Sequence, residues 1–309
     1  MKKKYRLITR SDFDGLVCAM ILKELGMISD IKFVHPKDMQ DGLIPVNDND
    51  ISTNLPYVEG IHLAFDHHVS EISRLHVLKD NYIIDVNAPS AARVVYNYYN
   101  GKVNAPRISE ELLAAVDKSD SAQFTLDEIL NPKGWVLLNY IMDARTGLGR
   151  FRNFRISNYQ LMMELIDYCL EHSVDEILKL PDVKERVDLY FSHTEKFKEQ
   201  LMRIHKIDGD VVILPLKEEE IIYTGNRFMV YAMFPEAKIS VHVMWGFRKQ
   251  NTAITIGKSI LNRTSDISIG DICLEYGGGG HRNAGTCQID NDMAQDVLNE
   301  IVDKLNQRI

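Results

Sequence analysis

Over the first hundred residues, short apolar runs of strand length alternate with segments whose apolar residues recur at helical spacing. The runs predict strands at 5–9, 31–34, 50–53, 61–65 and 82–84. The predicted helices are 14–25, which Gly26 ends, and 90–99, for which Ser90 is the expected N-cap. Strands that alternate with helices predict an α/β fold, in which a parallel sheet carries helices on both faces.

The rest of the chain is first mainly helical and then mixed. The predicted helices are 109–116, 157–172, 174–179 and 183–204, and the last of these is long and highly charged. Beyond Gly209 the pattern predicts strands at 210–215, 220–223, 237–246 and 251–256, and a closing helix at 292–305. We therefore predict an N-terminal domain over 1–183, a linker helix over 184–206 and a smaller C-terminal α/β domain over 207–309.

The composition of the 309 residues supports two packed domains and narrows the class of partner. No apolar stretch is long enough to cross a bilayer, and the lysines after Met1 precede no signal-peptide segment, so we predict a cytoplasmic protein without a membrane partner. The net charge of −8 argues against a partner that is long nucleic acid, but it allows a short charged substrate in a local basic pocket. Four cysteines without CxxC spacing are expected to be buried thiols: Cys18, Cys169, Cys273 and Cys287.

Metal-binding side chains follow two of the predicted strands. Asp66, His67 and His68 end the apolar run 61–65, and Asp12 and Asp14 follow the first strand in the same way. Ligands of parallel sheets bind outside the carboxyl ends of the strands, so these side chains are expected at one edge. Carboxylates and imidazoles suit Mn²⁺ and also accept Mg²⁺, and such ions promote hydrolysis of phosphate esters.

A third motif lies near the C-terminus, where four glycines precede a histidine at 277–281. In this order and at this spacing, the aspartate pair, the Asp-His-His triplet and the glycine-rich motif resemble the DHH phosphoesterase superfamily, specifically its two-domain branch with a DHHA1 domain. The resemblance covers nearly the whole chain. It implies a DHH catalytic domain followed by a DHHA1 substrate-binding domain, and Mn²⁺ as cofactor, with Mg²⁺ as the alternative and one or two ions per chain.

The resemblance also implies roles for individual residues. Asp12 resembles the aspartate of a first metal ion, whereas Asp14 and His67 resemble ligands of a second. His68 resembles the residue near the scissile phosphate, and Asp66 orients the two histidines. Asp120 resembles the remaining ligand of the second metal, with Asp117 as its competitor.

Two positions depart from the family pattern. Asn54 stands where the family has a metal-bridging aspartate, and we expect its oxygen to assist as a neutral, weaker metal ligand. Arg10 stands where the family often has a histidine ligand. Our hypothesis is that the first metal is weak or absent and that Arg10 supplies positive charge to the phosphate instead. His35 or Asp38 is the alternative, as a compensating ligand.

The C-terminal motif predicts the part of the protein that holds the far end of the substrate. Backbone amides of consecutive glycines can approach an anion closely. The resemblance implies substrate contacts from Gly278, Gly279, Gly280, His281, Arg282, Asn283, Lys258, Ser259 and Arg263. Tyr223, Phe228 and Tyr231 could stack on a base, although residues that alternate on a strand, as we expect these to do, more often belong to a core. A cluster of arginines could line the substrate cleft and is equally well explained by a solvated loop: Arg145, Arg150, Arg152 and Arg155.

Together these observations predict a phosphoesterase that hydrolyses short nucleotide phosphodiesters, such as a linear dinucleotide or a very short RNA, to nucleoside monophosphates. An exopolyphosphatase or pyrophosphatase is the alternative within enzymes. A nucleotide or phosphate sensor with weakened catalysis is the alternative outside enzymes, and an interaction scaffold is a third. The chain is also compatible with a homodimer.

Overall fold

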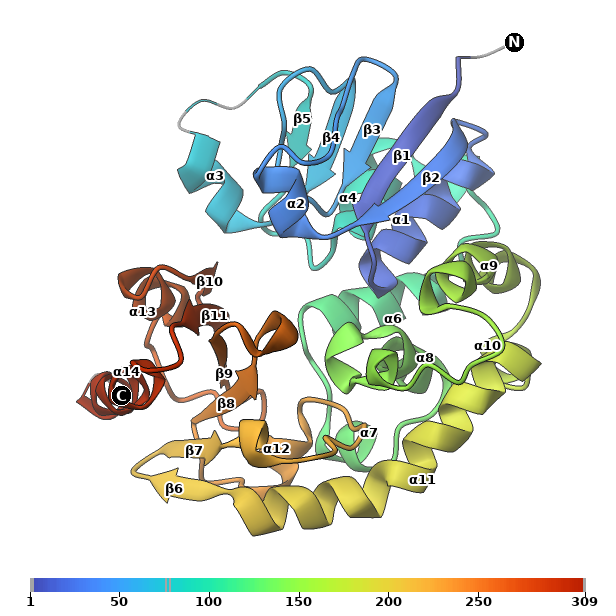
Figure 1. Cartoon of the computed structure of the whole chain (residues 1–309). Helices are drawn as coiled ribbons and strands as arrows, with labels where there is room; N and C mark the ends of the chain where they lie inside the picture. Colours follow the sequence, from blue (N-terminus) through green and yellow to red (C-terminus); the bar gives the residue numbers. More distant parts are fainter. Residues whose placement is uncertain (1–2, 76, 78, 308–309) are drawn as a thin grey trace. The chain divides into compact units, whose positions relative to one another are not determined.

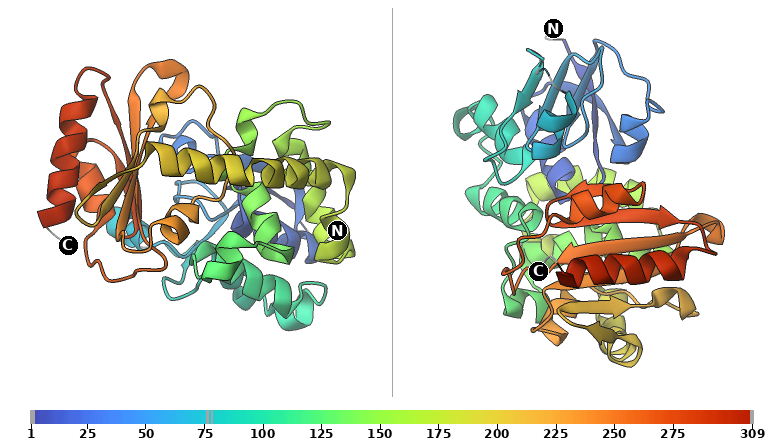
Figure 2. Two further views of the ribbon diagram at one scale, coloured as in Figure 1. Left: turned by 90° about the horizontal axis from the view of Figure 1, so that it is seen from below. Right: turned by 90° about the vertical axis from the view of Figure 1, so that its left-hand side faces the viewer.

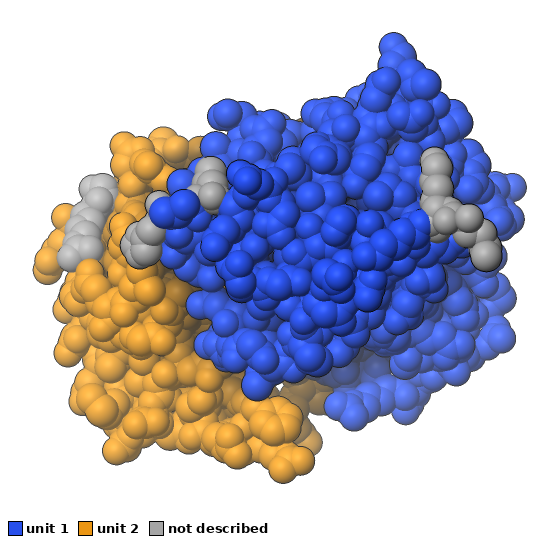
Figure 3. Space-filling model, turned by 90° about the horizontal axis from the view of Figure 1, so that it is seen from above, with its two compact units in different colours: residues 1–124, 132–188 blue, residues 125–131, 189–309 orange. Residues whose placement is uncertain are grey.

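The computed structural model describes residues 3–75, 77 and 79–307. The chain divides into two compact units, which Figure 3 colours separately. Unit 1 consists of Met1–Phe124 and Pro132–Asp188, and unit 2 consists of Thr125–Asn131 and Leu189–Ile309. The division falls within the long helix α11 (Pro181–Ile204).

Unit 1 contains a five-stranded sheet in the order β2-β1-β3-β4-β5, and all of its pairings are parallel (Figure 1). The strands are β1 (Tyr5–Arg10), β2 (Ile28–Val34), β3 (Asp50–Thr53), β4 (Leu63–Asp66) and β5 (Tyr82–Ile84). The predicted α/β class with a parallel sheet is thereby confirmed. The carboxyl ends of β1, β3 and β4 are neighbours in this order, which brings the residues that follow them to one edge.

Both faces of this sheet are buried. Neighbouring residues of a strand point to opposite faces, and accordingly Leu7 and Ile8 belong to different apolar clusters. Leu7 packs with the helix α1 (Phe13–Glu24), which is buried along most of its length, and with α4 (Ala91–Tyr98). Ile8 packs with Met39 of α2 (Pro36–Gln40). Helices therefore cover both faces, as a parallel sheet requires.

The remaining helices of unit 1 follow the sheet in sequence. They are α3 (Val69–Leu75), α5 (Gly101–Asn104), α6 (Glu110–Asp120), α8 (Gly134–Met142), α9 (Asn158–Glu171) and α10 (Val174–Ile177), with short 3₁₀ turns η1 (Ala144–Thr146) and η2 (Leu148–Arg150). The helix predicted at 109–116 is longer than expected, and its last residue is Asp120. Helix α8 was missed because its nearly continuous apolar sequence has no helical period.

Unit 2 contains a six-stranded mixed sheet in the order β10-β11-β9-β8-β7-β6. Helices α13 and α14 cover one of its faces and share an apolar core with it, as Figure 2 shows for α14. The elements are β6 (Lys206–Asp208), β7 (Val211–Leu214), β8 (Ile239–Trp245), β9 (Thr252–Lys258), β10 (Gly279–His281), β11 (Ala284–Ile289), α7 (Leu126–Leu130), α12 (Met229–Met233), α13 (Ile269–Glu275), α14 (Ala294–Gln307), η3 (Leu216–Glu218) and η4 (Phe247–Lys249).

The strand predicted at 220–223 is wrong. This segment is irregular because side chains of α11 bind its backbone in place of a neighbouring strand. The Gln200 amide donates to the Ile221 carbonyl at 2.7 Å and accepts from the Tyr223 N–H at 3.1 Å. The His193 ring accepts from the Thr224 N–H at 3.3 Å. Among the described residues, no helix is both long and apolar enough to cross a membrane.

Candidate metal and phosphate site

The turn from β1 to α1 positions the first acidic pair. Asp12 is the N-cap of α1, and its Oδ1 accepts the N–H of Gly15 at 2.9 Å. Gly15 is required by close approach, because a Cβ atom there would lie 2.0 Å from the Arg10 carbonyl oxygen. The glycine lets the first turn of α1 pack against the end of β1, which places Asp14 in that turn.

The carboxylate of Asp14 is buried and held by the N-terminus of another helix. Its two oxygens accept the backbone N–H groups of Ala91 at 2.9 Å and Ala92 at 2.7 Å, which begin α4. Ser90 caps the same helix as predicted, since its side chain accepts the N–H of Arg93. These bonds fix the orientation of Asp14, and the positive end of the helix dipole favours its ionised form.

His67 faces Asp14 and Asp120 from the end of β4. Its Nδ1 lies 3.1 Å from the Ala88 carbonyl oxygen, so the ring donates its proton there and directs Nε2 to the other side. Nε2 lies 2.9 Å from Oδ2 of Asp120, the last residue of α6. Ligand atoms of Asp14, His67 and Asp120 all lie within 4.8 Å of one another. The structure therefore brings together three of the predicted metal ligands from three separate elements.

Asp66 orients the neighbouring histidine. Its Oδ1 lies 2.7 Å from Nδ1 of His68 and also accepts the N–H of His67 at 2.9 Å. Its Oδ2 accepts the hydroxyl of Tyr82 at 2.9 Å. Asp66 is 1% exposed, so these bonds are shielded from water and hold the His68 ring firmly.

The titration behaviour of this cluster reflects buried negative charge. Burial and the nearby Asp120 raise the pKa of Asp14 to about 8. Burial alone would lower the pKa of His67, but the bond and the charge of Asp120, together with Asp14, raise it to about 9. The charge of His67 outweighs burial at Asp120 and lowers the pKa of that carboxyl. A divalent cation fits two carboxylates and one imidazole nitrogen, because it would take the place of the protons that Asp14 and His67 hold without it.

Asp117, the competing candidate for a metal ligand, binds two other side chains instead. Its Oδ1 accepts the Ser90 hydroxyl at 2.6 Å, and its Oδ2 accepts Nε of Arg93 at 2.9 Å. Among the described residues it belongs to no cluster of three metal-binding groups, and the same holds for His35 and Asp38. Nδ1 of His35 accepts the N–H of Lys37 as an N-cap.

Asp12 lies against Arg10 and Asn54. Nε of Arg10 lies 2.9 Å from Asp12 Oδ2, and Nδ2 of Asn54 donates to Asp12 Oδ1 at 3.2 Å. Asn54 is 1% exposed and adopts a left-handed backbone with φ of 56°. Its Oδ1 is a buried acceptor without a hydrogen-bond partner among the described residues.

In unit 2 the glycine-rich motif forms part of the sheet. Gly279 and Gly280 lie in β10 and pair with β11. The N–H of Gly278 donates to the Cys273 carbonyl at 2.8 Å, so this amide serves the fold. A Cβ on Gly280 would lie 2.3 Å from the Ala284 carbonyl oxygen, so close packing of the hairpin requires glycine there.

The other predicted substrate residues lie at one end of the same sheet. The N–H of Lys258 donates to the Asn283 carbonyl, which places the end of β9 beside the exposed turn after His281. Arg282 in this turn is exposed, and its guanidinium reaches the Asp266 carbonyl at 3.4 Å. Three other predicted contacts serve the following loop: Nζ of Lys258 donates to the carbonyls of Ser265 and Ile267, the Ser259 hydroxyl accepts the N–H of Asn262, and Nε of Arg263 donates to the Ile260 carbonyl.

The aromatic and arginine candidates separate into buried and exposed groups. Phe228 and Tyr231 are buried near and within α12, and this helix replaces the strand on which they were expected to alternate. Tyr223 is partly buried in the irregular segment that α11 holds. Nε of Arg145 donates to Oδ1 of Asp143 at 2.7 Å. Burial raises the pKa of Asp12, and the charges of Arg10 and, to a smaller extent, Arg145 oppose that shift.

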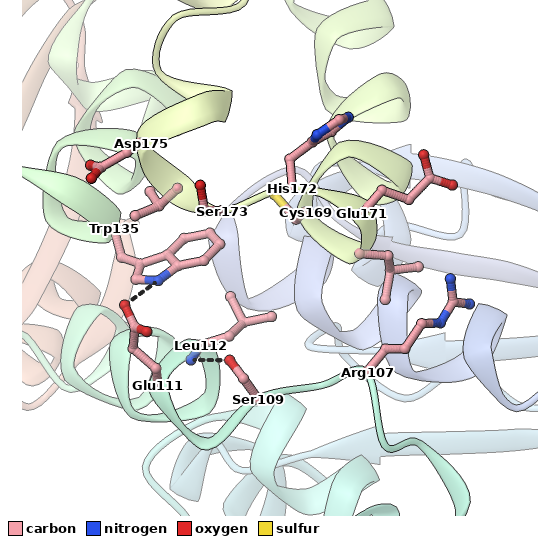
Figure 4. A pocket seen from close by; sticks show the side chains of 12 residues that line it. Arg107, Ser109, Glu111, Leu112, Trp135, Cys169, Glu171, His172, Ser173 and Asp175 are labelled. Atoms are coloured by element: carbon pink, nitrogen blue, oxygen red, sulfur yellow. Dashed lines mark hydrogen bonds between the residues drawn. The ribbon is translucent and has the colours of Figure 1, made fainter.

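A hollow of about 460 Å³ in unit 1 contains none of the predicted site residues (Figure 4). Trp135 lines it and donates from its indole N–H to Glu111 at 3.1 Å. The Trp135 ring also stacks on Phe13, with ring centroids 6.0 Å apart. Phe13 lies between Asp12 and Asp14, so the wall of this hollow supports the turn that carries the acidic pair.

Sequence reasoning missed the groups that orient the ligands. Tyr82, the Ala88 carbonyl and the amides of Ala91 and Ala92 contact the site from β5 and the start of α4. The N-cap at Ser90 was the available signal, because a helix N-terminus near a carboxyl edge attracts an anionic side chain. The carbonyl and the amides carry no mark of residue type, so a sequence cannot reveal them.

Comparison with solved structures identifies the family. The chain is 56% identical to the pGpG-specific phosphodiesterase PggH from Vibrio cholerae, with 99% of this chain and all of that chain covered and a TM-score of 0.83. At 13% identity, a DHH-domain protein described as a member of a family of ribosomal proteins has a TM-score of 0.59 and shares the fold, with 99% of this chain and 88% of that chain covered. RecJ from Thermus thermophilus, solved with Mn²⁺, shares the fold at 12% identity and a TM-score of 0.57, over 99% of this chain and 52% of its own.

No protein-family model and no curated protein matches the chain. The fold, the Asp-His-His triplet and the full-length similarity to a phosphodiesterase nevertheless agree, and the chain belongs to the DHH phosphoesterase superfamily.

Proposed function

We propose that the protein is a phosphodiesterase that hydrolyses linear dinucleotides of the pGpG type to nucleoside monophosphates, with Mn²⁺ as the preferred cofactor. The cluster of Asp14, His67 and Asp120 carries the proposal, because its ligand atoms converge within 4.8 Å. The 56% identity to PggH over the full chain supports the substrate class. A cytoplasmic location and a homodimer stay predictions of the sequence.

Asp14, His67 and Asp120 would hold the divalent cation. When bound, it neutralises phosphate oxygens and favours the nucleophilic form of water. The Ala88 carbonyl keeps the proton of His67 on Nδ1 and leaves Nε2 as the ligand atom. The backbone amides that hold Asp14 fix its carboxylate before any ligand arrives, so little ordering is needed when the cation binds.

His68 would act on the phosphate as a cation. Burial opposes its protonation, but the bond and the charge of Asp66 outweigh burial and raise its pKa. The imidazolium then stabilises the negative charge that develops on phosphate oxygens during hydrolysis. Asp66 keeps this ring in place and, being held by Tyr82, does not itself contact the substrate in this proposal.

The exposed turn after β10 is proposed to bind the far end of the substrate. His281, Arg282 and Asn283 are exposed together there. Arg282 contributes the guanidinium fork that suits a terminal phosphate. Lys258 and Ser259 support this turn indirectly in our proposal, because their side chains bind the loop that follows β9.

Turnover of a small substrate panel tests the proposal. The purified protein with Mn²⁺ is assayed on pGpG, a cyclic dinucleotide, a short RNA, a nucleoside bisphosphate and pyrophosphate, with the Asp14→Ala/His67→Ala double variant as control. We expect turnover of pGpG that the double variant loses. Turnover of pyrophosphate without pGpG would favour the phosphoanhydride hydrolase, and binding of pGpG without any turnover would favour the sensor.

A further inference from the structure

The acidic pair at the start of α1 has two different surroundings. Asp14 faces His67 and Asp120, so its neighbourhood contains further negative charge and ligand atoms. Asp12 faces Arg10, which forms an ion pair with it, and Asn54, which donates a hydrogen bond to it. The contrast divides the site into two halves. The Asp14 half contains Asp14, His67 and Asp120, which can hold a cation, and the Asp12 half contains Asp12, Arg10 and Asn54, in which Arg10 already supplies positive charge.

Protein groups already bind both oxygens of Asp12. Oδ1 accepts the N–H of Gly15 at 2.9 Å and Nδ2 of Asn54 at 3.2 Å. Oδ2 lies 2.9 Å from Nε of Arg10. A guanidinium beside a carboxylate supplies a full positive charge. Arg10 therefore supplies a positive charge to this half of the site, although burial still raises the pKa of Asp12 overall.

Asn54 is oriented by this arrangement. If its amide were turned over, Oδ1 would face the carboxylate of Asp12, and two acceptors would oppose each other. The favourable orientation directs Nδ2 to Asp12 and leaves Oδ1 buried without a partner among the described residues. Its left-handed backbone, with φ of 56°, is tolerated by asparagine and aspartate better than by most residues. An aspartate would therefore fit the same backbone.

We propose that this chain holds a single divalent cation, at Asp14, His67 and Asp120, and that the guanidinium of Arg10 takes the place of a second. Asp12 and Asn54 serve as positioning residues in this arrangement, since Asp12 clamps Arg10 and Asn54 clamps Asp12. The inference rests on the proposed phosphoesterase function, because it assigns Arg10 to the phosphate of that reaction.

The geometry of Arg10 suits a phosphate contact. Its Nε is the atom that faces Asp12, and its side chain is 31% exposed at the end of β1. The terminal nitrogens have no hydrogen-bond partner among the described residues, so the planar fork is free for two oxygens of one phosphate. Arg145, fixed by Asp143 at 2.7 Å, adds a second guanidinium whose charge acts on Asp12.

The number of Mn²⁺ ions per chain tests the inference directly. Metal-free protein is titrated with Mn²⁺ by calorimetry, and free Mn²⁺ is counted in parallel by electron paramagnetic resonance. We expect one tightly bound ion in the wild type and none in Asp14→Ala. We expect two in the Arg10→His/Asn54→Asp double variant, because the new histidine and aspartate add two metal ligands beside Asp12. Two tight ions in the wild type, or one in the folded double variant, would contradict the inference.

A kinetic variant keeps the inference testable if the double variant does not fold. Arg10→Ala removes one charge-assisted contact to the phosphate, so we expect KM for pGpG to rise about tenfold to a hundredfold, while Mn²⁺ affinity stays unchanged. An unchanged KM would contradict the role of Arg10. Two tight ions with normal pGpG turnover would overturn only this inference, whereas one ion without turnover of any phosphate ester would overturn the proposed function.

Discussion

Asp12 and Asp14 are separated by one residue, yet the structure compensates their negative charges in opposite ways. Arg10 forms an ion pair with Asp12, and Asn54 donates a hydrogen bond to the same carboxylate. Among the described residues, the hydrogen bonds to Asp14 come from neutral backbone N–H groups, and Asp14 shares its cluster with Asp120 and the imidazole of His67. From this comparison we infer that a family motif marks where ligands lie, whereas the charge of their neighbours decides which of them needs a cation.

The largest expected effect on activity comes from a substitution among Asp14, His67 and Asp120, where we place the cation. His67→Ala removes the nitrogen that faces Asp120, and the remaining carboxylates then repel each other without a shared ion. We expect loss of tight Mn²⁺ binding and a fall in kcat on the order of a thousandfold, because a catalytic cation contributes several kcal/mol. Calorimetry and initial rates on pGpG measure both. Retained Mn²⁺ binding would show that the cation lies elsewhere.

Two aspartates of α6 test which carboxylate belongs to the metal-binding cluster. Asp120→Asn removes a carboxylate from the cluster, so Mn²⁺ affinity is expected to fall by on the order of a hundredfold or more. Asp117→Asn is the matched control, because Asp117 binds Arg93 and Ser90 instead. It should lower thermal stability and leave the affinity for Mn²⁺ unchanged. The reverse result, with Asp117→Asn losing the ion, would exchange the two assignments.

The dependence of kcat on pH tests the role of His68. Asp66 raises the pKa of His68 against the effect of burial, so the active imidazolium persists to higher pH and the rate falls as pH rises through that pKa. Asp66→Asn removes this charge. We expect the alkaline limb of kcat to move to lower pH and kcat at neutral pH to fall about tenfold to a hundredfold. An alkaline limb that does not move would exclude His68 as its origin.

The smallest effect is a pH dependence of stabilisation by Mn²⁺. Asp14 has its pKa raised from 3.8 to about 8, and His67 has its pKa raised from 6.5 to about 9. Between its unfolded and its native pKa, each of these groups holds a proton in the native metal-free protein that the unfolded chain has released. The free energy of unfolding of the metal-free protein therefore falls as pH rises through these ranges. A bound cation replaces these protons. The rise in Tm on adding Mn²⁺ is therefore expected to be larger at about pH 8.5 than at about pH 6.

A rise in Tm that is equal at both pH values would show that the cation does not displace those protons. The Asp14→Ala variant is the control for this measurement, since it removes the raised carboxyl and should show little stabilisation at either pH. Melting curves of metal-free protein with and without Mn²⁺ provide the comparison.

Much of unit 1 could be predicted from the chain because its signals are local. The strand at 5–9 and the N-cap at Ser90 were correct, and the first of these fixes where Asp12 and Asp14 stand. The convergence of Asp120 with His67 follows from tertiary packing of α6, and only the family resemblance indicated it.

Unit 2 was harder to predict because tertiary contacts decide its local structure. The segment at 220–223 has the composition of a strand, but Gln200 on α11 binds its backbone. The glycines of 277–280 suggest a loop, yet Gly280 is required by close packing against β11. The sequence of each segment does not reveal these contacts, because each contact joins residues that are not neighbours in the chain.

Anomalous diffraction from a crystal grown with Mn²⁺ tests the central claim most directly. The account predicts one strong anomalous peak per chain, among the ligand atoms of Asp14, His67 and Asp120, with Arg10 still paired to Asp12. A second peak between Asp12 and Asn54, with Arg10 displaced, would contradict the claim that the chain itself compensates that half of the site.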